Sequence, residues 1–295
     1  MEAIPMRQRS NLLAVCCAAA LLLAAAPRSL RAQDSGPMEP AESTKFPTPP
    51  PPSKPDPPVL PPDEIIRRFA AKEDEMVQAI KGYTFQRDIR IEEMGAGNKP
   101  AGQLEVVSQL RVTPDGRMYE KPVNRPPSTL HYLDLERGDN ELIAPAPMFP
   151  LTTAILPKYE ITYGGREKLD ELNTYYFSVK PRALERAHAY FSGVVWVDSQ
   201  DLVIVKTIGK WVTEGGDVTV GKLPFTVFET YRQQVGQNYW FPAYARSDES
   251  IPSGDGSVSV RAIVKWTDFT PISSSPATDS QAPAPAKSPE SKGTP

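Results

Sequence analysis

The stretch Tyr190–Trp211, YFSGVVWVDSQDLVIVKTIGKW, reads as two strands joined by a polar turn. Side chains alternate between the two faces of a strand, so neighbouring residues point to opposite sides. Apolar residues fall on both faces: Val194 with Trp196 and Val195 with Val197 in the first strand, Leu202 with Ile204 and Val203 with Val205 in the second. An antiparallel sheet usually buries one face and wets the other. We therefore expect further material to cover the second face of this hairpin.

Residues 1–32 are predicted to be a secretory signal peptide. Two arginines precede the apolar run Leu12–Ala26, which is short for a membrane span, and we expect cleavage after Ala32. An uncleaved N-terminal anchor is the alternative. Both cysteines lie inside the apolar run, so the exported chain is expected to have no thiol. Export without disulfides favours the bacterial periplasm, with secretion as the other possibility.

Composition divides the remainder into three parts. Residues 33–62 are rich in proline and are predicted to be an extended, disordered linker. Residues 271–295 are rich in serine and proline, poor in apolar residues, and predicted to be a disordered tail. Residues 63–270 suit one large β-rich domain. The net charge of −3, without a block of basic residues, argues against a nucleic-acid partner.

The periodicity of apolar residues predicts one helix followed by a meander of strands. The helix lies within 61–82, with proline and acidic residues at its start and Gly82 where its C-terminal end is expected. From Tyr83 onward the period changes to two, and about nine or ten strands follow, most of them joined by tight turns.

Residues 125–157 interrupt the strand pattern with repeated prolines. We expect a short helix near Ser128–Leu135 and, after it, a lid containing the apolar residues Met148, Phe149, Leu151, Ile155 and Leu156. Two architectures fit the pattern: a β-sandwich, and a curved open sheet. A terminal helix and a mid-chain lid favour the second. The expected fold is mainly β (α+β), a strongly curved antiparallel sheet forming an incomplete β-barrel, capped by the N-terminal helix and the mid-chain helical or loop lid.

Residues suited to catalysis are few. Outside residues 1–32 there is no cysteine, the histidines are His131 and His188, and the HExxH, GxSxG, Walker and GxGxxG motifs are absent. We therefore expect a non-catalytic protein without cofactor or metal. Neighbouring carboxylates at 92–93, 170–171 and 248–249 leave a hydrolase as a remaining alternative, which would need two such groups about 5–10 Å apart.

Aromatic residues give the stronger signal, because they recur in the predicted strands as adjacent pairs that face opposite ways. Any single aromatic residue is explained by packing in one of two ordinary hydrophobic cores, one on each side of the sheet. Together they permit an apolar cavity. The residues that we expect to line it or its lid are Phe149, Leu151, Val194, Trp196, Val203, Val205, Phe228 and Trp240.

Three phrases resemble a known family: LPKYEITYGGREKLDELNTYYFSVKPR, YFSGVVWVDSQDLVIVKTIGK and FETYRQQVGQNYWFPAYARSDE. They are similar to periplasmic proteins of the outer-membrane lipoprotein-sorting type (LolA/LolB-like, also RseB-like), over about 63–270. The resemblance implies an incomplete β-barrel with an apolar concavity that binds acyl chains of lipoproteins or other envelope lipids. It also implies an alternative: a sensing or protein-interaction module of the same fold that binds a membrane-bound envelope protein.

The sequence departs from the lipoprotein carrier in two ways. The proline-rich linker and the tail are additions, and no residue matches the arginine that latches the carrier's lid. Arg87, Arg90 and Arg111 are the arginines in predicted strands that we consider for that role.

Overall fold

The computed structural model describes residues 57–135, 149–186, 188–217, 225–236, 239–254 and 256–272. The expected signal peptide, most of the linker, nearly all of the tail and Met148 lie outside these ranges. Within them, the expected fold class is confirmed: an open antiparallel sheet accompanied by an N-terminal helix.

Helix α2 spans Pro62–Ala79 and continues into the 3₁₀ turn η1, Ile80–Gly82. Its start follows from the sequence, because a proline at the first position needs no hydrogen-bond partner and two acidic residues occupy the first turn. Its buried stripe consists of Ile65, Phe69, Ala70, Glu73 and Met76. A charged residue within this stripe is unusual, and it becomes important at the site described below.

The strands follow in chain order, with two further 3₁₀ turns. They are β1 Tyr83–Met94, η2 Ala96–Asn98, β2 Pro100–Val112, β3 Met118–Asn124, η3 Leu156–Lys158, β4 Tyr159–Leu169, β5 Leu172–Pro181, β6 Tyr190–Asp198, β7 Ile204–Thr213, β8 Gly216–Asp217, β9 Val227–Val235, β10 Tyr239–Ser253 and β11 Gly256–Pro271.

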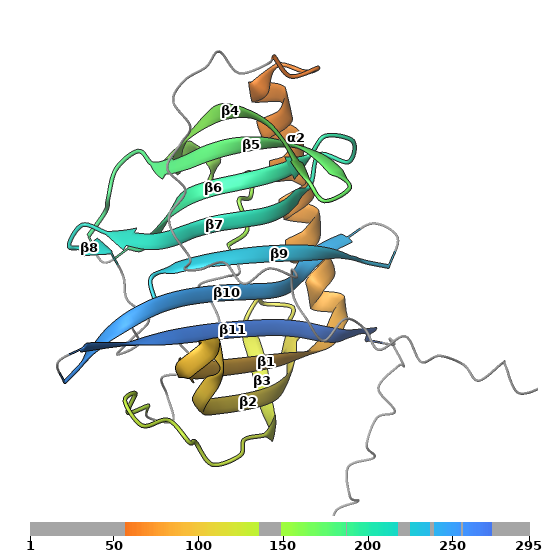
Figure 1. Ribbon diagram of the computed structural model, residues 1–295. Helices are drawn as coiled ribbons and strands as arrows, with labels where there is room; N and C mark the ends of the chain where they lie inside the picture. Colours follow the sequence, from red (N-terminus) through yellow and green to blue (C-terminus); the bar gives the residue numbers. More distant parts are fainter. Residues whose placement is uncertain are drawn as a thin grey trace, which may run out of the picture. The chain divides into compact units, whose positions relative to one another are not determined.

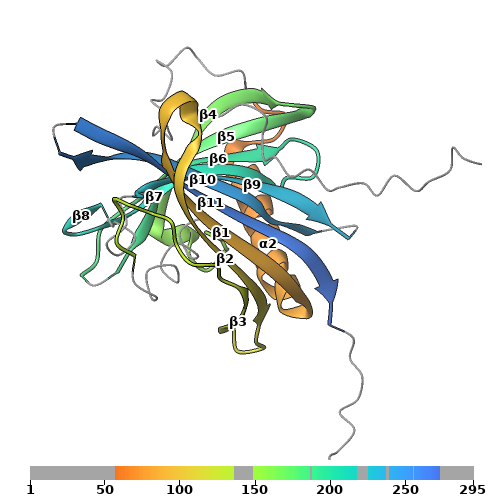
Figure 2. The ribbon, with the colours of Figure 1, turned by 60° about the horizontal axis from the view of Figure 1, so that its bottom comes forward.

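These strands form one sheet in the order β3-β2-β1-β11-β10-β9-β7-β6-β5-β4, with β8 added beside β7. All pairings are antiparallel. After β3 the chain moves to the opposite edge, begins again at β4, and returns strand by strand until β11 pairs with β1. The edges β3 and β4 do not pair with each other, so the barrel is incomplete (Figure 1). The view in Figure 2 shows how strongly the strands twist.

Helix α2 crosses one face of the sheet, which we call the inner face (Figure 1). Its first half packs with residues of β4 to β7, and its second half packs with residues of β1, β2 and β9 to β11. We call the apolar material between α2 and the sheet the inner layer. It consists of two clusters, one around Phe69 and Phe177 and the other around Ile80 and Trp266.

The hairpin Tyr190–Trp211 is buried on both faces, as its pattern predicts. Val195, Val197, Leu202 and Ile204 belong to the inner layer. Val194, Trp196, Val203 and Val205 form a separate cluster on the opposite, outer face, with Leu169, Leu172, Tyr176, Ile208 and Trp240 packed against it. The second apolar face of the hairpin is therefore a small core of its own.

The helix expected near Ser128–Leu135 is wrong. That segment is irregular, and the Glu93 carboxylate accepts hydrogen bonds from the backbone N–H groups of His131, Tyr132 and Leu133 at 2.8, 2.6 and 2.9 Å. The backbone donors of Tyr132 and Leu133, which a helix starting near Ser128 would have used internally, are thus bound by a buried side chain from β1.

Candidate functional site

The segment 149–158, which we call the lid segment, covers part of the inner face beside α2. Its first aromatic ring, Phe149, stacks on Phe191 of β6 with ring centroids 4.5 Å apart and an interplanar angle of 9°. The same ring meets Trp211 edge-on at 5.6 Å and Tyr159 at 5.7 Å. Such ring contacts add about 0.5–1.5 kcal/mol each beyond the area that they bury. Phe149 therefore holds the start of the lid segment against the sheet.

Two glycines make room for this stack. Gly193 and Gly209 are cross-strand partners on β6 and β7, and the Phe191 ring lies over both. A Cβ atom at Gly209 would lie 2.2 Å from Cζ of Phe191, which no real side chain tolerates. The Phe191 ring thus packs directly on the backbone of the two glycines, and the Phe149 ring stacks on the Phe191 ring.

A buried ion pair connects the helix, the lid segment and the sheet. Arg232 of β9 donates to both carboxylate oxygens of Glu73 on α2, at 2.5 and 3.0 Å, and also to the backbone oxygen of Phe149 at 3.2 Å. Glu73 accepts the backbone N–H of Leu151 at 3.2 Å. The two charged side chains are only 4% and 2% exposed. Separating the lid segment from the helix would leave the ion pair intact but would remove its bonds to the backbone oxygen of Phe149 and the backbone N–H of Leu151, and a buried polar group that loses its hydrogen bond costs about 1–3 kcal/mol.

A small cavity of about 110 Å³ lies beside this pair. We call it the inner cavity. It is lined by Met76, Val77, Ile80, Lys81, Val112, Gly116, Phe149, Pro150, Arg232 and Pro242. Ligand pockets typically measure about 300–1,000 Å³, so this cavity is too small for a lipid chain while Phe149 stays in place.

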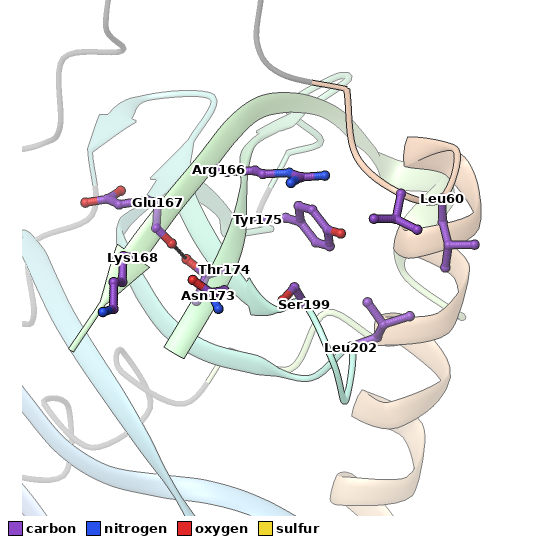
Figure 3. Close-up of a pocket in the computed structure, with 10 residues that line it drawn as sticks. Leu60, Arg166, Glu167, Lys168, Asn173, Thr174, Tyr175, Ser199 and Leu202 are labelled. Atoms are coloured by element: carbon purple, nitrogen blue, oxygen red, sulfur yellow. Dashed lines mark hydrogen bonds between the residues drawn. The ribbon is translucent and has the colours of Figure 1, made fainter. Parts of the chain in front are cut away.

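A larger cavity of about 550 Å³ lies where the start of α2 meets the β4–β5 hairpin (Figure 3). We call it the hairpin cavity. Its apolar side consists of Leu60, Tyr175 and Leu202, which belong to the inner layer or pack against it. Val59, Arg166, Glu167, Lys168, Asn173, Thr174 and Ser199 complete the lining. The hairpin cavity therefore borders the packed side chains of the inner layer on one side.

Leu202 reaches this cavity through an uncommon backbone conformation. Its φ is +53°, in the left-handed region that branched apolar residues rarely adopt. The preceding turn enforces it, because Oδ2 of Asp198 accepts the backbone N–H groups of Gln200 and Asp201 at 3.0 and 2.7 Å. The Leu202 side chain is thereby buried in the inner layer at the margin of the hairpin cavity.

The residues expected from the sequence to line one cavity are divided among three clusters. Phe149 and Leu151 belong to the inner layer near the first half of α2, and Phe228 belongs to it near the second half. The outer cluster contains the remaining five residues: Val194, Trp196, Val203, Val205 and Trp240. Of the two cavities described above, only the inner cavity is bordered by one of the eight residues, Phe149.

The outer cluster continues into a group of charged and phenolic side chains. Nε1 of Trp196 donates to Oε2 of Glu167 at 2.7 Å. Lys206 lies over the rings of Trp196 and Tyr231 and pairs with Glu229 at 2.6 Å. Burial, together with the hydrogen bond that Tyr231 donates to Glu229, raises the pKa of Tyr231 well above its usual value. Tyr231 stays protonated at physiological pH, and this group serves as structural support.

In the described part of the chain, the three arginines considered from the sequence bind residues outside the lid segment. Arg87 is buried and bonds to Glu120 of β3 at 2.6 Å, Arg90 bonds to Glu105 at 3.2 Å, and Arg111 lies over Tyr119. The arginine that binds the lid segment is Arg232. A signal for it existed in the sequence, since Glu73 interrupts the apolar stripe of α2 and a buried carboxylate requires a partner.

Two of the carboxylates that were considered for hydrolysis, Glu93 and Asp248, have structural partners. Glu93 binds the backbone at 131–133, and Asp248 lies between Arg246 and Arg261, with Nε of Arg261 at 2.7 Å. Within the described ranges, no group of three or more histidine, cysteine, aspartate or glutamate side chains is placed to hold a metal ion. Among the described helices, none has the length and apolarity to cross a bilayer.

Comparison with known proteins gives likeness in structure only. No family model matches the chain, and no match was found among curated proteins. A DUF1329 family protein from Desulfovibrio piger is similar, with 12% identity over 72% of this chain and 94% of that chain, and a TM-score of 0.35. A LolA superfamily protein from Nitrosomonas europaea shows 11% identity over 70% and 94%, with a TM-score of 0.30.

MucB in complex with the periplasmic part of MucA shows 13% identity over 70% of this chain and 99% of that chain, with a TM-score of 0.23. The LolA superfamily and MucB agree with the groups that the sequence resemblance named. At this level of similarity, the function of the chain has to be argued from its own residues.

Proposed function

We propose that this protein is a periplasmic, non-catalytic binding or carrier protein that shelters acyl chains of lipoproteins or other envelope lipids in its inner layer. The observation that carries the proposal is the hairpin cavity, a preformed opening of about 550 Å³ whose apolar side is continuous with the inner layer. The family resemblance of the sequence supports the same ligand class.

In the described structure the inner layer is closed. The inner cavity measures about 110 Å³, and Phe149 and the Glu73–Arg232 pair hold the lid segment in place. We propose that an acyl chain enters at the hairpin cavity and takes the place of Phe149. Ten buried methylenes contribute about 8 kcal/mol, at about 0.8 kcal/mol each. That gain exceeds the combined loss of the three ring contacts of Phe149, about 1.5–4.5 kcal/mol, and of the burial of its side chain, about 1.5–3 kcal/mol, so an acyl chain can displace Phe149 while the ion pair persists.

The full chain, exported to a bacterial periplasm and purified without detergent, provides the direct test. We expect native mass spectrometry to show a near-stoichiometric acylated adduct, and solvent extraction to identify it. A clean mass of the chain alone, together with no uptake of added phospholipid or acylated peptide, would contradict the proposal.

A second candidate function is binding of a membrane-bound envelope protein. The edge strand β3 favours it, because Met118, Tyr119 and Val123 expose 44%, 54% and 61% of their surfaces there. Edge strands with exposed apolar side chains are sites where another chain can add, although Pro122 removes one backbone donor. A pull-down from envelope extract tests this candidate. Capture of one stoichiometric protein that is lost when Tyr119 and Val123 are changed to serine would support it. Capture of the same protein by the serine variant would contradict it.

A further inference from the structure

We propose that the hairpin cavity binds an anionic head group, carboxylate or phosphate, of the acyl ligand whose chain enters the inner layer. This inference rests on the proposed function and specifies its ligand: an amphipathic acyl anion.

Strand alternation separates the charges of β4. Arg166 is paired in register with Tyr175 of β5, and Lys168 with Asn173, so the two cations share the face on which Tyr175 lies. Glu167, between them, faces the other way and accepts the Nε1 hydrogen bond of Trp196 in the outer cluster. Figure 3 shows the Glu167 side chain directed away from Tyr175. Glu167, although it borders the cavity, is thus bonded to Trp196 and forms no ion pair with Arg166 in the described structure.

Arg166 is positioned before any ligand arrives. One of its terminal nitrogens donates to the backbone oxygen of Pro57 at 3.0 Å, and its guanidinium lies over the Tyr175 ring at 5.6 Å. Among the described residues, neither Arg166 nor Lys168 forms an ion pair with a carboxylate. A guanidinium has five N–H donors in a fixed plane, so several remain for a carboxylate or a phosphate.

Neutral groups and the apolar side complete the site. Asn173 and Ser199 border the cavity, and side chains of these types donate hydrogen bonds to anions. Leu60 and Leu202 lie across from Tyr175 and Arg166 (Figure 3). These two leucines lead into the cluster around Phe69 and Phe177. The cavity therefore has cationic and polar groups at its rim and apolar groups toward the inner layer. A ligand with an anion at one end and an acyl chain at the other matches this arrangement.

The experiment compares three ligands that share one oleoyl chain: oleate, 1-oleoyl lysophosphatidate and uncharged monoolein. Dissociation constants are measured by isothermal titration calorimetry with the full chain, below the critical micelle concentrations. Wild type should bind at least one of the two anions about tenfold more tightly than monoolein, as expected for a charge-assisted hydrogen bond. The anion bound more tightly identifies the head group.

The variant Arg166→Gln/Lys168→Gln should lose this tenfold preference and keep the affinity for monoolein. Lys180→Gln is the matched control, because Lys180 is an exposed cation of β5 outside the cavity lining, and it should behave as wild type. Equal affinity of wild type for all three ligands would overturn the inference while leaving the proposed function intact. A double variant that still prefers the anions would overturn it as well. Failure of all three ligands to bind would overturn the proposed function itself.

Discussion

Single residues hold the inner layer closed, and the Glu73–Arg232 pair is the clearest case. The change Arg232→Met should lower the free energy of unfolding by about 3–5 kcal/mol, because it leaves the Glu73 carboxylate buried without its partner. The double variant Glu73→Leu/Arg232→Met should recover most of that loss, since both buried charges are then gone. Urea unfolding measures both.

The control for this pair is Lys72→Ala, which removes an exposed ion pair with Glu75 on the same helix. Exposed pairs contribute about 0–1 kcal/mol, so its effect should be small. If Arg232→Met and Lys72→Ala lowered the free energy of unfolding by the same small amount, the buried pair would not hold the lid segment.

Gly209 tests the aromatic stack at the same scale. A methyl group there would meet the Phe191 ring, so Gly209→Ala should cost about 1–3 kcal/mol and displace Phe149 from its stacked position. Gly82→Ala is the matched control, because no atom lies within 4 Å of a Cβ built at Gly82. Thermal unfolding compares the two variants. Similar unfolding midpoints would contradict our claim that Gly209 leaves the space that the Phe191 ring occupies.

At the scale of elements, the carboxylate of Glu93 anchors the irregular segment that follows β3. Burial alone would raise the pKa of Glu93, but hydrogen bonds from the backbone of His131, Tyr132 and Leu133 lower it below its ordinary value. A lowered pKa in the folded state stabilises the protein above the pKa of the unfolded state, about 4.3, and that contribution disappears as the pH falls through the folded-state value.

Glu93→Gln should therefore be less stable than wild type at neutral pH, and the difference should shrink as the pH falls below about 4. Hydrogen exchange at residues 131–133 should be faster in the variant at neutral pH. Glu160→Gln, at an exposed carboxyl of β4, is the control. A stability difference that stays constant from neutral to acidic pH would contradict the role of the ionised carboxylate.

Elements were predictable from the sequence where local chemistry determines them. The helix at 62–82 and the two apolar faces of Tyr190–Trp211 follow from periodicity and were found in the structure. The segment near Ser128–Leu135 was not predictable, because its conformation depends on Glu93, a residue 38 to 40 positions away. Binding by a distant side chain does not change the pattern of apolar residues in the segment that is bound.

The candidate site could be located only from the arrangement of the whole molecule. Sheet order places β4 at one edge and β11 beside β1, and the larger cavity forms where the start of α2 meets the β4–β5 hairpin. Trp196 and Trp240 were expected to line the same cavity as Phe149, yet they lie on the outer face of the sheet. Which face of a two-sided hairpin lies beneath a helix depends on tertiary packing, which periodicity does not encode.

The central claim is that the inner layer shelters an acyl chain, and chain-length dependence of binding tests it most directly. We would titrate the full chain with octanoate, decanoate, dodecanoate and tetradecanoate by isothermal titration calorimetry at several temperatures. We predict that affinity rises about fourfold for each added methylene, with a negative heat-capacity change, until the layer is full. Affinity that is independent of chain length, or no binding at any length, would contradict the account.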